Sequence, residues 1–212
     1  MKAAIFDMDG TLVDSMTYWR KVNFDILCDN QIPIPEDLAE DLPVMSAYTA
    51  AKIYAQRYPQ LGMDTAQMIQ EYYRRMRFYY AHEVKAKPGA LDYLKQLNQQ
   101  GIPCCVATAT TMEIAGPLLE RLGFMPYLQF ATCTDDEITD KHDPQFFQIM
   151  AERLNVPVQD CAMFEDALYA AKSAKTAGCQ VIVVDDPTAV RNRNELKALC
   201  NRYIMDFREL LD

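Results

Sequence analysis

The sequence has no apolar run that approaches the ~18–20 residues needed for a helix to cross a bilayer, so we expect no membrane-spanning segment. Its N-terminus, Met1–Asp7, becomes acidic too early for a signal peptide, which favours a cytoplasmic location. Disulfide patterns are missing as well, because the 7 cysteines are an odd number and contain no Cys-X-X-Cys pair. Cys104, Cys105 and Cys161 lie in apolar runs, and we interpret them as reduced core thiols rather than zinc ligands.

Positive charge is also scarce. The chain has 21 Lys and Arg against 30 Asp and Glu, which gives a formal net charge of −9. A negative field of this size disfavours nucleic acids and anionic membranes as partners. It also repels small anions at long range, so a phosphate ester would bind only where the local charge is reversed. A bound Mg²⁺ together with a buried lysine would reverse it.

Four short apolar segments predict the strands of a sheet. Alternating with them are stretches with apolar residues at helical spacing, which Gly101, Gly123 and Gly178 bring to an end. Pro117 lies inside one such stretch and predicts a kink or a restart of that helix. This alternation predicts an α/β fold with a Rossmann-like parallel sheet and helices on both faces. The predicted strands are Ala3–Phe6, Ile102–Ala107, Ala162–Phe164 and Val181–Val184.

Residues 15–84 have a different pattern, with no clear strand and with apolar residues at helical spacing. Asp64 is placed as the N-cap of the longest of these helices. We therefore predict two domains. An α/β core consists of residues 1–14 and 85–212, and an α-helical cap domain of residues 15–84 is inserted after the first strand.

The end of the first predicted strand carries a strong chemical signal. Asp7 and Asp9 are at positions i and i+2, so their side chains point to the same side of the chain. They follow the carboxyl end of a parallel strand, where open α/β sheets bind ligands, and Gly10 allows a sharp turn after them. Two neighbouring carboxylates repel each other unless a divalent cation neutralises them. The pattern therefore predicts a metal-assisted site.

The segment Asp7–Ser15 resembles the first motif of the haloacid dehalogenase-like (HAD) superfamily. The remaining motifs follow in the family's order. Thr108 ends the next strand, Lys141 precedes a helix, and the pair Glu165-Asp166 ends a later strand. The resemblance covers essentially the whole chain, and although only the first motif is specific alone, the order and placement of the four make the joint match strong.

The resemblance implies a catalytic role for two carboxylates and a metal site beside them. Asp7 is the expected nucleophile, which forms an aspartyl phosphate. Asp9 is the expected general acid for the leaving oxygen, then the base that activates water. Mg²⁺ is expected to bind Asp7, the backbone carbonyl of Asp9, and Asp166, with Glu165 holding a metal-bound water or supporting these ligands.

The resemblance also assigns three residues to the phosphoryl group: Thr108, Ala109 and Lys141. The hydroxyl of Thr108 would donate to a phosphoryl oxygen, and Lys141 would add a positive charge and tether the nucleophile. Thr110 and Thr111 are rivals for the role of Thr108. Taken alone, Lys141 would be read as a solvated surface lysine.

The helical insertion resembles the cap of the β-phosphoglucomutase and phosphoglycolate phosphatase branch, which closes over the site and selects the leaving group. Mutases of that branch carry a His and an Arg in the cap where this chain has Trp19 and Ala47. Without those groups a second phosphate would be poorly compensated, which favours a hydrolase. One departure concerns the third motif, because relatives usually have Pro directly after the lysine and here His142 follows Lys141.

We therefore expect a Mg²⁺-dependent phosphatase that hydrolyses a small phosphomonoester through an aspartyl-phosphate intermediate. A sugar phosphate, phosphoglycolate or a nucleotide-like ester would fit. The presence of Asp9 favours phosphoryl transfer over dehalogenation, because a halide leaves without a proton and an alkoxide needs one. A β-phosphoglucomutase-like mutase is the alternative, followed by a non-catalytic binding protein that kept the fold. We expect a monomer or a weak dimer.

Overall fold

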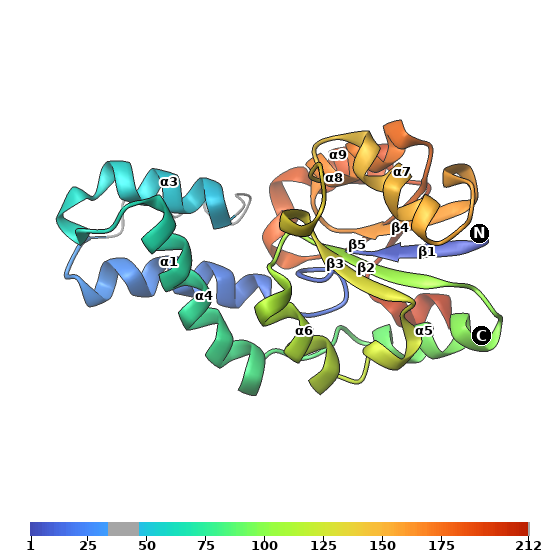
Figure 1. Cartoon of the computed structure of the whole chain (residues 1–212), viewed down its shortest axis with the longest axis horizontal. Helices are drawn as coiled ribbons and strands as arrows, with labels where there is room; N and C mark the ends of the chain where they lie inside the picture. Colours follow the sequence, from blue (N-terminus) through green and yellow to red (C-terminus); the bar gives the residue numbers. More distant parts are fainter. Residues whose placement is uncertain (34–46, 212) are drawn as a thin grey trace. The chain divides into compact units, whose positions relative to one another are not determined.

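The computed structural model describes residues 1–33 and 47–211 of the chain (Figure 1). They form two compact units, an α/β unit of residues 1–14 and 85–212 and a helical unit of residues 15–84. None of the helices in the described residues has both the length and the apolar character needed to span a membrane. The cysteines are free thiols, and Cys104, Cys105 and Cys161 are buried whereas Cys28 is exposed.

The α/β unit is built on one parallel six-stranded sheet with the order β3-β2-β1-β4-β5-β6. The chain starts at the central strand β1, runs outward on one side through β2 and β3, and returns to the other side for β4, β5 and β6. The carboxyl ends of β1, β2 and β4 therefore meet where the strand order reverses, a place where such sheets bind ligands. The strands are β1 (Ala3–Phe6), β2 (Cys104–Thr108), β3 (Phe130–Cys133), β4 (Cys161–Glu165), β5 (Gln180–Val184) and β6 (Arg202–Ile204).

Helices cover both faces of this sheet, which gives three layers (Figure 1). On one face, an apolar cluster joins the sheet to the helices α7, α8 and α9, with Ile5, Met163 and Phe147 among its members. On the other face, the ring of Phe6 stacks on that of Phe164 with the centroids 4.5 Å apart, and Tyr93 of α5 packs against Phe164. The helices of this unit are α5 (Ala90–Gln99), α6 (Met112–Arg121), α7 (Pro144–Arg153), α8 (Leu168–Ala177) and α9 (Arg193–Leu199).

The predicted α/β class is confirmed, and the predicted strands are present with boundaries shifted by at most two residues. Two further strands, β3 and β6, were not expected from the sequence. They are the two edges of the sheet, are only partly buried, and β6 has three residues. Short, partly polar edge strands give a weak apolar signal. The helix with Pro117 continues unbroken from Met112 to Arg121, so the restart that was considered does not occur.

The helical unit contains α1 (Met16–Asp29), α3 (Ala47–Arg57) and α4 (Thr65–His82). Asp64 caps α4 as predicted: its side chain accepts the amide of Gln67, whose own side chain accepts the amide of Asp64. The indole N–H of Trp19 on α1 donates to the hydroxyl of Tyr80 on α4 at 3.2 Å. Ala47 is the position at which mutases carry an arginine. Its side chain and the preceding residues 44–46 lie outside the described part of the chain.

Candidate active site

The loop after β1 carries the first two carboxylates. The amide of Asp7 donates to the carbonyl of Phe164 at 3.0 Å, which extends the pairing of β1 with β4 by one residue. The carbonyl of Met8 then accepts the amides of residues 11, 12 and 13 at 3.3, 3.0 and 3.0 Å. Gly10 makes this tight loop possible, because its φ of +86° lies in the left-handed region that favours glycine. The loop therefore holds Asp7 and Asp9 on a rigid backbone.

Lys141 links two of the predicted acidic residues. It lies in the loop before α7 and is only 2% exposed. Its ammonium donates to Oδ1 of Asp7 and, at 3.0 Å, to Oε2 of Glu165. The other oxygen of Glu165 accepts the amides of Asp166 and Ala167 at 3.2 and 3.1 Å, at the start of α8. Both carboxylates are thus fixed in orientation by the same lysine, which is buried and not solvated.

Asp166 lies against the loop that follows Asp7. The hydroxyl of Thr11 donates to Oδ1 of Asp166 at 3.1 Å. A Cβ atom added to Gly10 would lie 2.4 Å from Oδ2 of Asp166, so the backbone at Gly10 and this carboxylate are in direct contact. Glycine is therefore required here by its conformation and also by its lack of a side chain.

Asp9 is placed by the end of β2. The hydroxyl of Thr110 donates to Oδ2 of Asp9 at 2.7 Å, and the amide of Thr110 donates to the hydroxyl oxygen of Thr108 at 3.0 Å. Thr108, the last residue of β2, is buried, while Ala109 beside it is exposed. Thr111 has a separate task as the N-cap of α6. Thr108, Thr110 and Thr111, the three candidates for the hydroxyl that binds the phosphoryl group, thus differ in their contacts.

Burial and charge shift the protonation of the cluster. Burial, together with the charge of Glu165, raises the pKa of Asp7 to about 8, although Lys141 opposes the rise. Burial and then the charges of Glu165 and Asp7 raise the pKa of Asp166 well above its ordinary value. Burial lowers the pKa of Lys141, but Asp7 and Glu165 more than offset this, so its pKa lies above the ordinary value. The lysine stays charged, and the carboxylates need more positive charge to stay ionised.

The residues present fit a divalent cation. Asp7, Glu165 and Asp166 each offer a carboxylate oxygen, and these oxygens lie within 4.8 Å of one another. Within the described residues, Oδ2 of Asp7 is buried and has no hydrogen-bond partner. Lys141 donates to two of these three carboxylates and the charge of Lys87 acts on Asp166, yet burial and mutual repulsion still dominate at Asp7 and Asp166. Oxygen ligands of this kind are preferred by Mg²⁺ and Ca²⁺, and a divalent ion would balance the charge.

The structure gathers most of the residues that the sequence singles out, although they come from four separate segments of the chain. Asp7, Lys141, Glu165 and Asp166 form one connected cluster, and Asp9 is joined to the end of β2 through Thr110. Glu165 contacts Lys141 directly, a contact that the sequence did not indicate. The contact of Thr11 with Asp166 was also missed, although Thr11 belongs to the same short motif as Asp7.

Comparison with known proteins identifies the family of this chain. A family model described as haloacid dehalogenase-like hydrolase matches residues 1–178, which is most of the chain. The chain belongs to the haloacid dehalogenase-like hydrolase family. The resemblance that the sequence motifs indicate is thereby confirmed.

Two curated relatives and one solved structure show the nearer context. Hexitol phosphatase A of Escherichia coli (strain K12) is 27% identical over 198 residues, which cover 92% of this chain and 88% of that protein. Phosphoglycolate phosphatase of Agrobacterium fabrum is 30% identical over 184 residues, covering 85% and 79%. The crystal structure of CbbY from Rhodobacter sphaeroides in complex with phosphate has a TM-score of 0.83 at 22% identity, covering 99% and 96%, and shows the shared fold.

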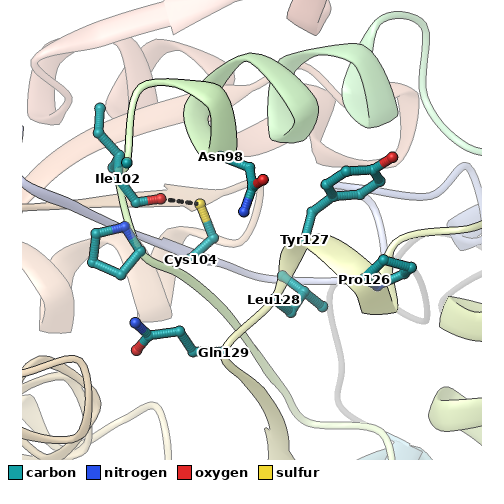
Figure 2. A pocket seen from close by; sticks show the side chains of 9 residues that line it. Asn98, Ile102, Cys104, Pro126, Tyr127, Leu128 and Gln129 are labelled. Atoms are coloured by element: carbon teal, nitrogen blue, oxygen red, sulfur yellow. Dashed lines mark hydrogen bonds between the residues drawn. The ribbon is translucent and has the colours of Figure 1, made fainter.

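A cavity of about 360 Å³ also opens on the α/β unit, at the amino ends of β2 and β3 (Figure 2). Asn98, Tyr127 and Gln129 are among its lining side chains, and the thiol of Cys104 donates to the carbonyl of Ile102 at 3.4 Å. Among the residues that the structure describes, its lining contains no charged side chain. The cavity lies at the edge of the sheet opposite to the acidic cluster and has no part in its chemistry.

Proposed function

We propose that this protein is a Mg²⁺-dependent phosphatase that hydrolyses a small phosphomonoester through an aspartyl-phosphate intermediate on Asp7. The observation that carries the proposal is the buried cluster of three carboxylates in which Lys141 bridges Asp7 and Glu165. The cluster lies at the carboxyl edge of the sheet where the strand order reverses. Membership of the hydrolase family supports it.

In the first step, a carboxylate oxygen of Asp7 attacks phosphorus, and the bond from phosphorus to the ester oxygen breaks. Asp9 gives its proton to that leaving oxygen, so an alcohol departs rather than an alkoxide. In the second step, Asp9 takes a proton from water, and the water oxygen attacks the phosphorus of the aspartyl phosphate. Inorganic phosphate leaves, and Asp7 is again a carboxylate.

The phosphoryl oxygens need donors and positive charge during both steps. We assign these to the hydroxyl of Thr108, the backbone amide of Ala109 and the ammonium of Lys141. Thr108 and Ala109 are at the carboxyl end of β2, beside β1, and Lys141 contacts the nucleophile directly. Preorganised donors of this kind stabilise the charge of the transferring group without rearranging during the reaction.

Mg²⁺ would be held by Asp7, the backbone carbonyl of Asp9, and Asp166, with Glu165 holding a metal-bound water or supporting these ligands. When bound, the ion supplies charge that neutralises the carboxylates and the phosphoryl oxygens. The partnerless oxygen of Asp7 and the raised pKa values of Asp7 and Asp166 support this assignment.

We assign the α/β unit as the catalytic core and residues 15–84 as a cap domain that selects the leaving group. The chemical class of the substrate follows from relatives, which are named as phosphatases of a hexitol phosphate and of phosphoglycolate. A sugar phosphate or another small metabolite ester is therefore the proposed substrate class. In place of the mutase histidine, α1 has Trp19, whose N–H is engaged by Tyr80, which favours the hydrolase over the mutase.

The test of this function is Asp7→Asn. The amide keeps the shape of the side chain but is a much weaker nucleophile, so release of inorganic phosphate in the presence of Mg²⁺ should fall by at least about 10³-fold. Asp92→Asn, at an exposed aspartate of α5 that pairs with Lys95, is the matched control and should keep full activity. Phosphate release that survives in Asp7→Asn would contradict the proposal. Conversion of a hexose 1-phosphate to its isomer without phosphate release would indicate a mutase.

A further inference from the structure

Lys87 is a second buried lysine, whose hydrogen bonds go to the segment after β5 although its charge also acts on Asp166 of the acidic cluster. It belongs to the segment just before α5 and is 6% exposed. Its ammonium donates to the backbone carbonyl of Asp185 at 2.8 Å and to Oδ2 of Asp186 at 2.9 Å, both just after β5. Burying an ammonium costs free energy unless it is paired and hydrogen-bonded, and these two contacts offset that cost.

The anchor that Lys87 binds is itself rigid. Oδ1 of Asp186 accepts both the amide and the hydroxyl of Thr188, at 2.9 and 2.6 Å. Asp185 accepts two hydrogen bonds from the guanidinium of Arg193, at 3.0 and 3.2 Å, and one from the hydroxyl of Tyr203 on β6. Lys87 is therefore attached to a fixed part of the sheet edge.

The backbone around Lys87 is paired with the loop that carries Asp9. The amide of Lys87 donates to the carbonyl of Leu12 at 2.9 Å, and Ala86 forms an antiparallel bridge with Val13. Val13 in turn forms a bridge with Asp9. Two short steps of backbone pairing thus connect the segment at residue 87 to the proposed general acid.

Besides the side-chain contacts of Thr110 with Asp9 and of Thr11 with Asp166, the backbone of the Asp9 loop has two attachments of different kinds. On one side it continues directly from β1, and on the other side it rests on residues 85–87. Those residues are not part of a strand of the sheet, and the side chain of Lys87 ties them to the end of β5. Removing that tie would leave the second attachment held by backbone hydrogen bonds alone, such as that from the amide of Phe207 to the carbonyl of Pro88, and therefore less firmly fixed. A misplacement of about 1 Å at a reacting group can cost about 10²-fold in rate.

We propose that Lys87 is a positioning residue that fixes the Asp9 loop for proton transfer by tying residues 85–87 to the carboxyl end of β5. The inference rests on the proposed phosphatase function and deepens it. According to this proposal, the contact of Lys87 with the end of β5 assists protonation of the leaving oxygen by Asp9 and does not affect the attack of Asp7 on phosphorus.

The test compares two esters at saturating Mg²⁺ in the full-length protein. The constant kcat/KM reports only the steps up to departure of the leaving group. Glycerol phosphate has an alkoxide leaving group that needs the proton of Asp9, whereas 2,4-dinitrophenyl phosphate has one that leaves without it. In Lys87→Met we expect kcat/KM to fall about 10- to 100-fold for glycerol phosphate and less than about 3-fold for the dinitrophenyl ester.

Three further variants complete the experiment. Asp9→Asn should show the same selective loss and defines its full size. Lys172→Met removes an exposed ion pair with Glu195 and should change neither value. Lys87→Met with Asp186→Asn removes both buried charges, so it should fold even where the single variant does not. Because the contact between Lys87 and Asp186 is still missing, this double variant should also lose activity toward glycerol phosphate while keeping its activity toward the dinitrophenyl ester.

An equal loss for both esters, or a double variant with the wild-type kcat/KM for glycerol phosphate, would overturn the role of Lys87. A wild-type protein that hydrolyses neither ester would overturn the phosphatase function and this inference with it. The two failures are therefore distinguishable.

Discussion

Lys141 donates to two carboxylates from different parts of the chain, Asp7 just after β1 and Glu165, the last residue of β4. At this scale the candidate site is a set of side chains held by hydrogen bonds to their neighbours, with Oδ2 of Asp7 left unpaired among the described residues. Thr11 holds Asp166, and Thr110 holds Asp9. The functional groups therefore keep their orientation before any substrate binds, which is a condition for efficient catalysis.

The first prediction at the residue scale concerns Thr110→Val. Valine keeps the volume of the side chain but removes the hydroxyl that donates to Asp9, so we expect kcat/KM for an alkyl phosphate to fall about 10-fold, or about 1.4 kcal/mol. Thr111→Val is the matched control one residue away. It removes the N-cap of α6 and should lower stability by about 1 kcal/mol while leaving kcat/KM unchanged. Steady-state kinetics and urea unfolding of both variants check this, and equal kinetic effects would argue against a role for Thr110.

The second prediction compares two glycines with positive φ. Gly10→Ala adds a methyl group that would lie 2.4 Å from Oδ2 of Asp166, whereas Gly62→Ala meets nothing within 4 Å. Both changes strain the backbone by about 1 kcal/mol. Only Gly10→Ala should also displace Asp166 and reduce phosphate release, by about 10²-fold. Activity assays and thermal unfolding separate the two effects. Similar activity in both variants would show that the contact between Gly10 and Asp166 tolerates a methyl group.

At the scale of elements, strand ends and helix caps determine where the side chains are placed. β1, β2 and β4 each end in a functional segment, because parallel strands bring their carboxyl ends to the same edge of the sheet. Helix α4 of the other unit begins with a reciprocal pair of hydrogen bonds between Asp64 and Gln67. This pair satisfies two amides that a helix would otherwise leave exposed at its start.

The prediction at this scale is that Asp64→Ala destabilises the helical unit. Loss of the cap should lower the free energy of unfolding by about 1 kcal/mol. Lys95→Ala, which breaks an exposed ion pair on α5, should change it by less than about 0.5 kcal/mol. Urea unfolding monitored by the fluorescence of Trp19, which lies in the helical unit, provides the measurement. An unchanged midpoint for Asp64→Ala would mean that the cap contributes nothing.

Much of the fold could be predicted because its determinants are local. Buried strands β1, β2, β4 and β5 appear as short apolar runs, and Gly178 with its φ of +105° ends α8 where the sequence indicates. The edge strands β3 and β6 could not be found in this way, because they have no continuous apolar run. Their place in the sheet depends on pairing with a neighbour distant in sequence.

The candidate site could be predicted in part for the same reason. Asp7 and Asp9 stand in one short motif, and their signal is local. Lys141 and Asp166 required the order of the motifs along the chain, since each residue alone resembles an ordinary surface or capping residue. The burial of Lys87 had no signal at all, because nothing near it in the sequence indicates a partner almost a hundred residues away.

For the whole molecule, the net charge of −9 includes carboxylates that are buried without enough positive charge beside them. Because the pKa of Asp7 is raised from 3.8 to about 8, the folded protein keeps a proton there that the unfolded chain releases above about pH 4. The stability of the metal-free protein should therefore fall as the pH rises from about 4 to 8. The raised pKa of Asp166 acts in the same direction.

The corresponding prediction is that Mg²⁺ stabilises the protein more at pH 8 than at pH 6. Metal binding needs ionised carboxylates and releases their protons, so affinity should rise by up to about tenfold per pH unit. The increase in Tm on adding Mg²⁺ should then be a few degrees larger at pH 8. Thermal unfolding at the two pH values, with Asp7→Asn as the control that removes one titrating ligand, measures this. Equal increases in the wild-type protein would contradict the assignment of Asp7 as a ligand.

The amide of Asp14 donates to the carbonyl of Lys85 at 2.9 Å, and Val13 pairs with Ala86. The chain thus leaves the sheet-containing unit and re-enters it at adjacent points, which these backbone contacts join directly. The insert between these points therefore changes neither the length nor the register of any strand in the sheet. Under the cap role proposed for residues 15–84, selectivity can therefore change with the insert while the groups proposed to act on phosphorus stay in place.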